Sequence, residues 1–307
     1  MSRNHGLYAA LFAVALLVQA LPNAADAAPP VPNGNITALR AAIANAAPGG
    51  TIVLFKNGTY TLDGTQLVIT KQITIKGHGA TIDGNDASGV IKIKSTGNLT
   101  LRNVIITGGA GHKGGGIDNA GTLTLSGNSS VTYSHSYLSK GGGIYNRRTG
   151  TLKLSDTSSV TNNGNYGEYQ HDGGGIYNDG GTVTLSDTSS VTDNSCDQYY
   201  GGGGIFNNGG TVTLKDTSSV SGNGAASGGG IYNTGTLTLS GNSSVSGNEA
   251  DDGGGILNTG TVTMSDTSRV SSNNADVGGG ILNGGTLINC IAGGNVVNNT
   301  VSDIFNE

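Results

Sequence analysis

Seven copies of one phrase occur between residues 114 and 283: three glycines, an isoleucine and, two residues after it, an asparagine. The isoleucines are Ile117, Ile144, Ile176, Ile205, Ile231, Ile256 and Ile281. Along the chain, successive isoleucines are separated by 27, 32, 29, 26, 25 and 25 residues. A repeat of roughly 20–50 residues is typical of a solenoid, whose units bury an apolar face only by stacking on their neighbours.

The repeat over residues 228–252 shows what one unit contains. Its apolar residues alternate with Thr and Ser in three short segments that are bounded by Gly or Asn. This alternation predicts short β-strands, with Ile231, Leu237 and Val245 pointing inward and Thr236 pointing outward. Three strands within one such repeat predict one turn of a parallel β-helix.

Two polar columns recur at fixed places in the repeat. The asparagine that follows each isoleucine, from Asn119 to Asn283, is predicted to form a structural ladder of stacked amides. Aspartates recur in a Leu-Ser/Lys-Asp-Thr-Ser phrase, at Asp156, Asp187, Asp216 and Asp266. Stacked carboxylates could hold Ca²⁺, but one coil has Asn242 instead, so we favour turn capping, which Asn serves equally well.

Residues 1–27 are predicted to be a secretory signal peptide. Arg3 and His5 precede an apolar run, and an Ala-x-Ala cleavage site follows it. The run is short for a transmembrane span, so an uncleaved membrane anchor is the less favoured alternative. We expect the mature protein to be secreted or held at the cell envelope, with no membrane-spanning segment left after cleavage.

The mature chain is predicted to form one solenoid. Residues 28–35 are a linker, residues 36–113 the N-terminal cap and first coils, and residues 114–307 the repeat coils of the same β-helix. The apolar spacing predicts an amphipathic helix over residues 36–47, with Asn35 as its N-cap, placed to cover the first coil. Short strands are predicted to follow it, among them residues 73–75, 80–83, 99–101 and 104–106. The expected fold is therefore all-β, a right-handed parallel β-helix of about ten coils with an N-terminal amphipathic capping helix.

Two stretches carry a resemblance to known proteins. Residues 36–84, from ITALRAAIANAAPGGTIVL to GATIDG, resemble the N-terminal part of pectin-lyase-like right-handed parallel β-helices. The GGGI…N and V-x-x-N phrases, the latter seen in Val160–Asn163 and Val245–Asn248, are similar to repeats of the polymorphic outer membrane proteins and other bacterial surface proteins. Such proteins include lyases, glycosidases and adhesins, so the resemblance implies the fold and leaves the function open.

The composition excludes several classes of partner. The chain has a formal net charge of −5, and only 11% of its residues are charged. An acidic surface without basic clusters argues against nucleic acid. The histidines lack the spacing of metal ligands, so we expect no metal site and no cofactor. The expected partners are a glycan or a cell-surface protein.

Tyrosine-rich segments form the candidate binding surface. The first four steps of the repeat are 2, 7, 4 and 1 residues longer than the final step. The additional residues fall just before the glycines, so they should protrude along one edge of the solenoid. These segments contain Tyr133, Tyr137, Tyr166, Tyr169, Tyr199 and Tyr200. A second row, predicted to face outward beside the inward isoleucines, comprises Tyr145, Tyr177, Phe206 and Tyr232. Insertions on one face of a solenoid often mark its binding side, and tyrosines give large amphipathic contact area. The sequence therefore predicts an adhesin-like module without catalytic residues.

An enzyme is the first alternative. Gly77-His78-Gly79 resembles a phrase near the active site of polygalacturonase-type glycosidases, and a polysaccharide lyase or glycoside hydrolase would suit the fold. Glycoside hydrolysis needs a pair of carboxylates, whereas Asp63, Asp83 and Asp86 stand in turn contexts. Arg40 and Arg102 lack the acidic neighbours of a lyase calcium site.

An ice-binding solenoid is the second alternative. Thr-x-Thr pairs recur on the outward face of one strand, as in Thr211/Thr213 and Thr236/Thr238. Strand geometry spaces such an array at about 4.8 by 6.7 Å. Lys153 and Ile288 interrupt it, and outward Thr is also a common β-sheet residue.

Overall fold

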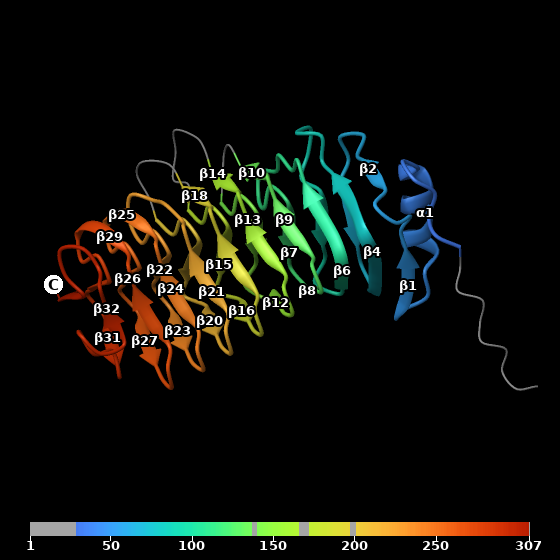
Figure 1. The fold of residues 1–307 in the computed structure, drawn as a ribbon. Coiled ribbons are helices and arrows are strands. Elements are labelled where there is room, and N and C mark those ends of the chain that lie inside the picture. The colour runs from blue at the N-terminus through green and yellow to red at the C-terminus, as the bar shows by residue number, and fades with distance from the viewer. Residues whose placement is uncertain (1–28, 137–139, 166–171, 197–200, 307) are drawn as a thin grey trace, which may run out of the picture.

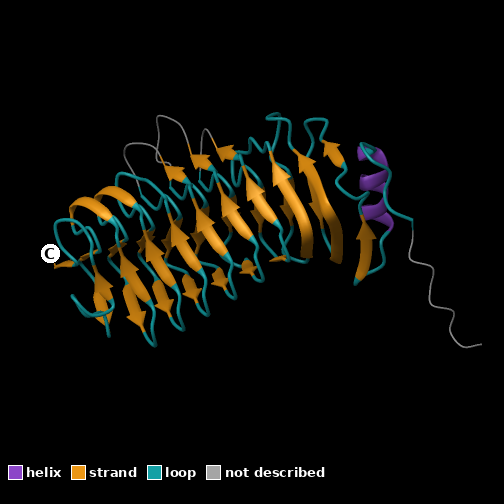
Figure 2. Ribbon diagram, viewed as in Figure 1, coloured by secondary structure: helices purple, strands orange, loops and turns teal. Residues whose placement is uncertain are grey.

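The computed structural model describes residues 29–136, 140–165, 172–196 and 201–306. Figure 1 shows an elongated stack of coils that runs from the N-terminal helix to the C-terminus, and Figure 2 shows that strands make up nearly all of its regular structure. Each coil pairs in parallel with the coils before and after it, as β22 (Ile231–Asn233) does with β19 (Ile205–Asn208) and β26 (Ile256–Asn258). The expected all-β parallel solenoid of about ten turns is confirmed.

Two large sheets run the length of the stack. The ten-stranded sheet holds the Ile-x-Asn strands and contains β3 (Leu67–Ile69), β5 (Ile91–Ile93), β7 (Ile117–Asn119), β11 (Ile144–Asn146), β15 (Ile176–Asp179), β19, β22, β26, β30 (Ile281–Asn283) and β33 (Ile304–Asn306). The eighteen-stranded sheet contains β1 (Gly50–Val53), β2 (Thr59–Thr61), β4 (Gln72–Asp83), β6 (Asn98–Thr107), β8 (Thr122–Ser126), β9 (Ser130–Thr132), β12 (Thr151–Leu154), β13 (Ser159–Thr161), β16 (Thr182–Leu185), β17 (Ser190–Thr192), β20 (Thr211–Leu214), β21 (Ser219–Ser221), β23 (Thr236–Leu239), β24 (Ser244–Ser246), β27 (Thr261–Met264), β28 (Arg269–Ser271), β31 (Thr286–Ile288) and β32 (Val296–Val297).

Two smaller sheets lie just before the glycine turns. One contains β10 (His135–Ser136), β14 (Gly164–Asn165) and β18 (Ser195–Cys196), and the other contains β25 (Glu249–Asp252) and β29 (Asn274–Val277).

The first coils have longer strands than the sequence predicts. The expected strands at residues 73–75 and 80–83 form one strand, β4, and those at 99–101 and 104–106 form β6. The register between β4 and β6 shifts after Lys76, and His78 there has a φ of 50°. A β-bulge therefore bends β4 without ending it, because the extra residues are absorbed in one strand.

Helix α1 (Ile36–Asn45) covers the N-terminal end of the stack (Figure 1). The Asn35 side chain accepts a hydrogen bond from the Ala38 amide at 2.8 Å, so the predicted N-cap is confirmed. Leu39 and Ile43 of the helix are buried in the same core as the first coil. Part of the predicted linker also packs on the first coil, since Val31 is buried and forms a β-bridge with Leu54. Within the described residues, no helix has the length and apolar character to cross a membrane.

Aliphatic side chains of successive coils form one continuous core. Ile231, Leu237 and Val245 are fully buried, while Thr236 on the outward side of the strand is exposed. Register pairing places each of these residues directly against its equivalent in the next coil, as for Leu237 and Val262. The inward and outward assignments made from the alternation are therefore confirmed.

Two amide ladders run parallel to this core. In the first, each Asn Nδ2 donates to the Oδ1 of the next at 2.7–3.0 Å, through Asn119, Asn146, Asn178, Asn207, Asn233, Asn258, Asn283 and Asn306. The second, built from the V-x-x-N phrases, joins Asn163, Asn194, Asn223, Asn248, Asn273 and Asn299 at 2.9–3.0 Å. Each buried amide also binds backbone carbonyls, for example Asn207 with Gly210. The ladders therefore provide hydrogen-bond partners for the polar groups that are buried at the turns of each coil.

The recurring aspartates stabilise turns. Asp156, Asp187, Asp216 and Asp266 all have φ near +57°, between 56° and 58°. Each carboxylate accepts a hydrogen bond from a turn amide of the preceding coil, as Asp187 does from the Asp156 amide at 3.0 Å. These bonds agree with the turn-capping interpretation and extend it, because the caps link neighbouring coils. Among the residues that the structure describes, no three metal-ligating side chains gather.

The triple glycines are required by two separate constraints, shown by Gly141 and Gly142. Gly141 has a φ of 73°, a conformation that side chains with a Cβ rarely adopt. A Cβ on Gly142 would lie 2.1 Å from the Gly164 carbonyl oxygen of the next coil. The glycine turns thus let successive coils approach to the spacing of paired strands.

Candidate functional site

The ten-stranded sheet presents one outward side chain per coil, at the position between its two inward residues. In chain order these are Val68, Lys92, Asp118, Tyr145, Tyr177, Phe206, Tyr232, Leu257, Leu282 and Phe305. Each is the register partner of the next, so they form a continuous line that we call the outward column. Its chemistry changes along the stack, from charged through aromatic to aliphatic.

The aromatic part of the outward column is a stack of rings. The Tyr145 and Tyr177 centroids lie 5.3 Å apart at 11°, and those of Tyr177 and Phe206 lie 5.3 Å apart at 18°. Phe206 and Tyr232 follow at 4.7 Å with a tilt of 46°. The predicted row is therefore present, and it points away from the core. Stacking at these distances stabilises the column beyond simple area burial.

The expectation that this whole row faces solvent is wrong. Tyr145 is 5% exposed and Tyr177 is 2% exposed. Each ring is covered by a neighbouring ring and by a cation, since Lys113 Nζ lies 5.1 Å from the Tyr145 centroid and Lys140 Nζ lies 4.6 Å from that of Tyr177. The ring faces of these two tyrosines are thus already occupied.

The phenol groups of both tyrosines have partners. Tyr145 Oη donates to Asp179 Oδ2 at 2.8 Å, and Lys140 Nζ donates to Tyr177 Oη at 3.0 Å. Burial raises the pKa of Tyr145 and of Tyr177 above the ordinary tyrosine value. Burial alone would lower the pKa of Lys140, but its hydrogen bonds to Tyr177 and Asp172 outweigh this and raise it. At neutral pH, the phenols of Tyr145 and Tyr177 are therefore neutral and the amine of Lys140 is charged.

The charged part of the outward column centres on Asp118, which is 3% exposed. Arg147 Nε donates to Asp118 Oδ1 at 2.6 Å and Arg147 Nη2 donates to Oδ2 at 2.8 Å, a bidentate pair. Lys92 Nζ lies 3.7 Å from Oδ2. The hydrogen bonds with Asp118 raise the pKa of Arg147. The buried carboxylate is thus neutralised and holds the guanidinium in place.

A polar hollow of about 600 Å³ opens beside this charged group. In the part of the chain that the structure describes, its cationic side chains are Lys92, Lys113 and Arg147, against the carboxylate of Asp118. Gly64, Thr65, Gln66, Ala87, Ser88, Gly89, Ala110, Gly111 and His112 complete this lining. Its volume falls within the ~300–1,000 Å³ typical of small-molecule sites. We call it the cationic pocket.

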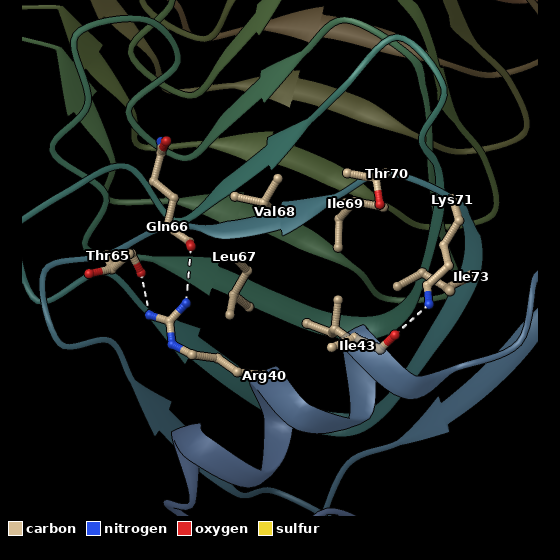
Figure 3. Close-up of a pocket in the computed structure, with 11 residues that line it drawn as sticks. Arg40, Ile43, Thr65, Gln66, Leu67, Val68, Ile69, Thr70, Lys71 and Ile73 are labelled. Atoms are coloured by element: carbon tan, nitrogen blue, oxygen red, sulfur yellow. Dashed lines mark hydrogen bonds between the residues drawn. The ribbon is translucent and has the colours of Figure 1, made fainter.

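A second hollow of about 430 Å³ lies between α1 and β3, and Figure 3 shows the side chains around it. Its wall is mainly aliphatic, with Ile43 of the helix facing Leu67 of the first coil. Arg40 donates to the Gln66 carbonyl at 3.0 Å, and Lys71 donates to the Ala44 carbonyl at 2.6 Å. Because both cations fasten the helix to the coil, this hollow belongs to the capping contact.

Of the other predicted site residues, the structure describes only Tyr133. Tyr133 is 66% exposed and has a φ of 45°, at a turn after β9 that is outside the outward column. Tyr137, Tyr166, Tyr169, Tyr199 and Tyr200 lie outside the described residues. The sequence interpretation missed Lys92, Asp118, Lys113 and Arg147. Extending the outward position one coil back from Tyr145 would have found Asp118, since Ile117-Asp118-Asn119 has the same pattern.

The acidic residues of the first coils serve local structure. Asp63 pairs with Arg40 at 2.7 Å and accepts from the Thr65 amide, and this contact with Arg40 lowers the pKa of Asp63. Asp83 accepts from the Asn85 amide at 2.8 Å, which closes a turn. His78 lies in the bulge of β4.

No protein-family model, curated protein or solved structure matches this chain.

Proposed function

We propose that this protein is an exported, non-catalytic β-solenoid that binds a glycan or a cell-surface partner along the edge where the outward column meets the glycine turns. The kinship with pectin-lyase-like β-helices and with bacterial surface-protein repeats forms part of the same proposal. The observation that carries it is the composition of the outward column.

The two large sheets differ in their outward residues. On the Thr-x-Thr strands of the eighteen-stranded sheet, the outward residues are threonines in most coils, as in Thr182, Thr211 and Thr236. The outward column instead changes from ionic pairs to stacked rings to leucines. Outward side chains contribute nothing to the aliphatic core, so packing of the core does not require this differentiation. Differentiated, aromatic-rich surfaces are typical of recognition.

The residues that follow the three tyrosine-rich segments lie beside the outward column. Lys140 follows the first of them and lies over Tyr177, and Asp172 follows the second and pairs with Lys140 at 2.9 Å. Gly201 follows the third, and a Cβ there would lie 2.1 Å from Tyr232 Cδ1. The residues that directly follow the three tyrosine-rich segments therefore lie at one edge of the solenoid, which supports this edge as the proposed binding surface.

The test is a glycan array and a cell-binding assay with residues 28–307. The variant Tyr166→Ser/Tyr169→Ser/Tyr199→Ser/Tyr200→Ser should lose at least ten-fold in affinity, because it removes amphipathic contact area from this edge. Its melting temperature should stay within about 2 °C of the parent, since the aliphatic core is untouched. The matched control is Thr182→Ser/Thr184→Ser/Thr211→Ser/Thr213→Ser on the other sheet, which should bind normally. Equal binding by the tyrosine variant and the parent would refute the proposal.

The threonine face supports a second candidate function, ice binding. In register along the eighteen-stranded sheet stand Thr74, Thr100, Thr124, Thr184, Thr213, Thr238 and Thr263. Lys153 interrupts this line between Thr124 and Thr184. Thermal hysteresis of the mature protein measures this activity directly and separates it from glycan binding.

A further inference from the structure

We infer that the cationic pocket binds an acidic saccharide unit, with Lys92 and Lys113 contacting its carboxylate or sulfate. This inference deepens the proposed function by naming a ligand class and a place at the N-terminal end of the outward column. It rests on three features of the pocket: its charge, its lining and its fixed geometry.

Charge is the first feature. The chain as a whole has a formal net charge of −5, yet three cations meet at this hollow against one carboxylate in its described lining. Asp118 accepts both hydrogen bonds of Arg147, and Lys92 makes only a longer ion pair with it at 3.7 Å. One carboxylate therefore does not balance the three cations, and positive charge at Lys92 and Lys113 remains for a ligand. A positive hollow on an acidic protein concentrates anions locally and repels them elsewhere.

The lining decides between classes of anion. Among the described residues that line the pocket there is no Phe or Tyr, and the apolar side chains are the methyl groups of Ala87 and Ala110. A nucleobase or an apolar peptide side chain would find little hydrophobic contact there. Thr65, Gln66 and Ser88, with the exposed backbone of Gly64, instead offer donors and acceptors. This lining suits the many hydroxyl groups of a sugar.

The geometry is held before any ligand arrives. Asp118 is buried and orients Arg147 through a bidentate pair, and Arg147 Cζ lies 5.5 Å from the Tyr145 ring centroid. Lys113 is held 5.1 Å from the same centroid. A pre-organised arrangement of cations lowers the entropic cost of binding. Beyond the pocket, the outward column continues through the buried Tyr145 and Tyr177 to the half-buried Phe206 and Tyr232.

The experiment is calorimetric titration of residues 28–307 with three defined oligosaccharides: a glucuronate-containing tetrasaccharide, a sulfated tetrasaccharide, and a neutral tetrasaccharide of glucose. We expect at least one acidic sugar to bind, with an affinity that falls as salt rises, and the neutral sugar to bind at least ten-fold more weakly. The two acidic probes distinguish a carboxylate ligand from a sulfate ligand.

Two double variants locate the site. Lys92→Gln/Lys113→Gln should weaken acidic-sugar binding at least ten-fold, while Lys76→Gln/Lys153→Gln removes the same charge at exposed positions outside the pocket and should bind as the parent does. Circular dichroism and urea unfolding of both variants should match the parent, since Arg147 still neutralises Asp118.

The outcomes separate this inference from the proposed function. If neither acidic sugar binds, or if both double variants bind alike, the cationic pocket is not the site and the inference is wrong. Loss of partner binding in the tyrosine variant alone would then still support the edge as the binding surface. If the lysine variant loses acidic-sugar binding while the tyrosine variant keeps it, the pocket stands and the tyrosine edge does not.

Discussion

Replacing Asn207 with Ala should lower the free energy of unfolding by about 3 kcal/mol, because several buried polar groups lose their partners at once. Asn207 is fully buried. Its Oδ1 accepts from Asn178 at 2.8 Å, and its Nδ2 donates to Asn233 at 2.8 Å and to the Gly210 carbonyl at 3.0 Å. Urea unfolding followed by circular dichroism measures the loss.

The adjacent Asn208 provides a matched control for this variant. Asn208 is exposed, and its Nδ2 donates to Asp179 at 3.1 Å. Asn208→Ala should cost less than about 0.5 kcal/mol, as is usual for surface substitutions. Similar losses for Asn207→Ala and Asn208→Ala would show that the first amide ladder does not stabilise the solenoid.

Replacing Arg147 with Ala should destabilise the protein by about 3 kcal/mol, because it leaves the buried carboxylate of Asp118 without its bidentate partner. Lys92 remains 3.7 Å away and compensates in part, so the loss should be at the lower end for a broken buried pair. Urea unfolding at neutral pH measures the effect.

Two further variants make this prediction specific. Arg148→Ala, at the exposed neighbouring position, should change stability by less than about 0.5 kcal/mol. Asp118→Ala/Arg147→Ala should be more stable than Arg147→Ala alone, because it removes the stranded charge together with its partner. If the double variant were the less stable of the two, the buried ion pair would not explain the loss.

The repeat pattern predicted most of the fold because each inward position recurs in every coil. Leu237 and Val245 are fully buried, and the ladder through Asn207 forms as the spacing indicated. The helix ends at Asn45, two residues before the predicted end. The joined strands of β4 were missed because turn residues such as Gly77 and His78 indicate an end of strand, whereas a bulge accommodates them within one.

The candidate site was predicted less well, for a physical reason. Alternation tells which way a side chain points, so the row from Tyr145 to Tyr232 could be placed on one face. It does not tell what covers that face, and the burial of Tyr177 depends on Lys140, 37 positions away along the chain. The cationic pocket unites residues from four coils, from Gly64 to Arg147, and no local pattern brings them together.

Residues in register stack one coil apart in this solenoid, whatever length of chain joins them. Double electron–electron resonance tests this stacking with two pairs of spin labels, Thr100→Cys/Thr213→Cys and Thr100→Cys/Thr263→Cys. In both variants Cys196 and Cys290 are replaced by Ala. The register places these pairs four and six coils apart. At ~4.8 Å per coil, the backbone separations should be about 19 and 29 Å, with label distances that differ by about 10 Å. Equal distances for the two pairs, or a shorter distance for the second pair, would contradict the stacked solenoid.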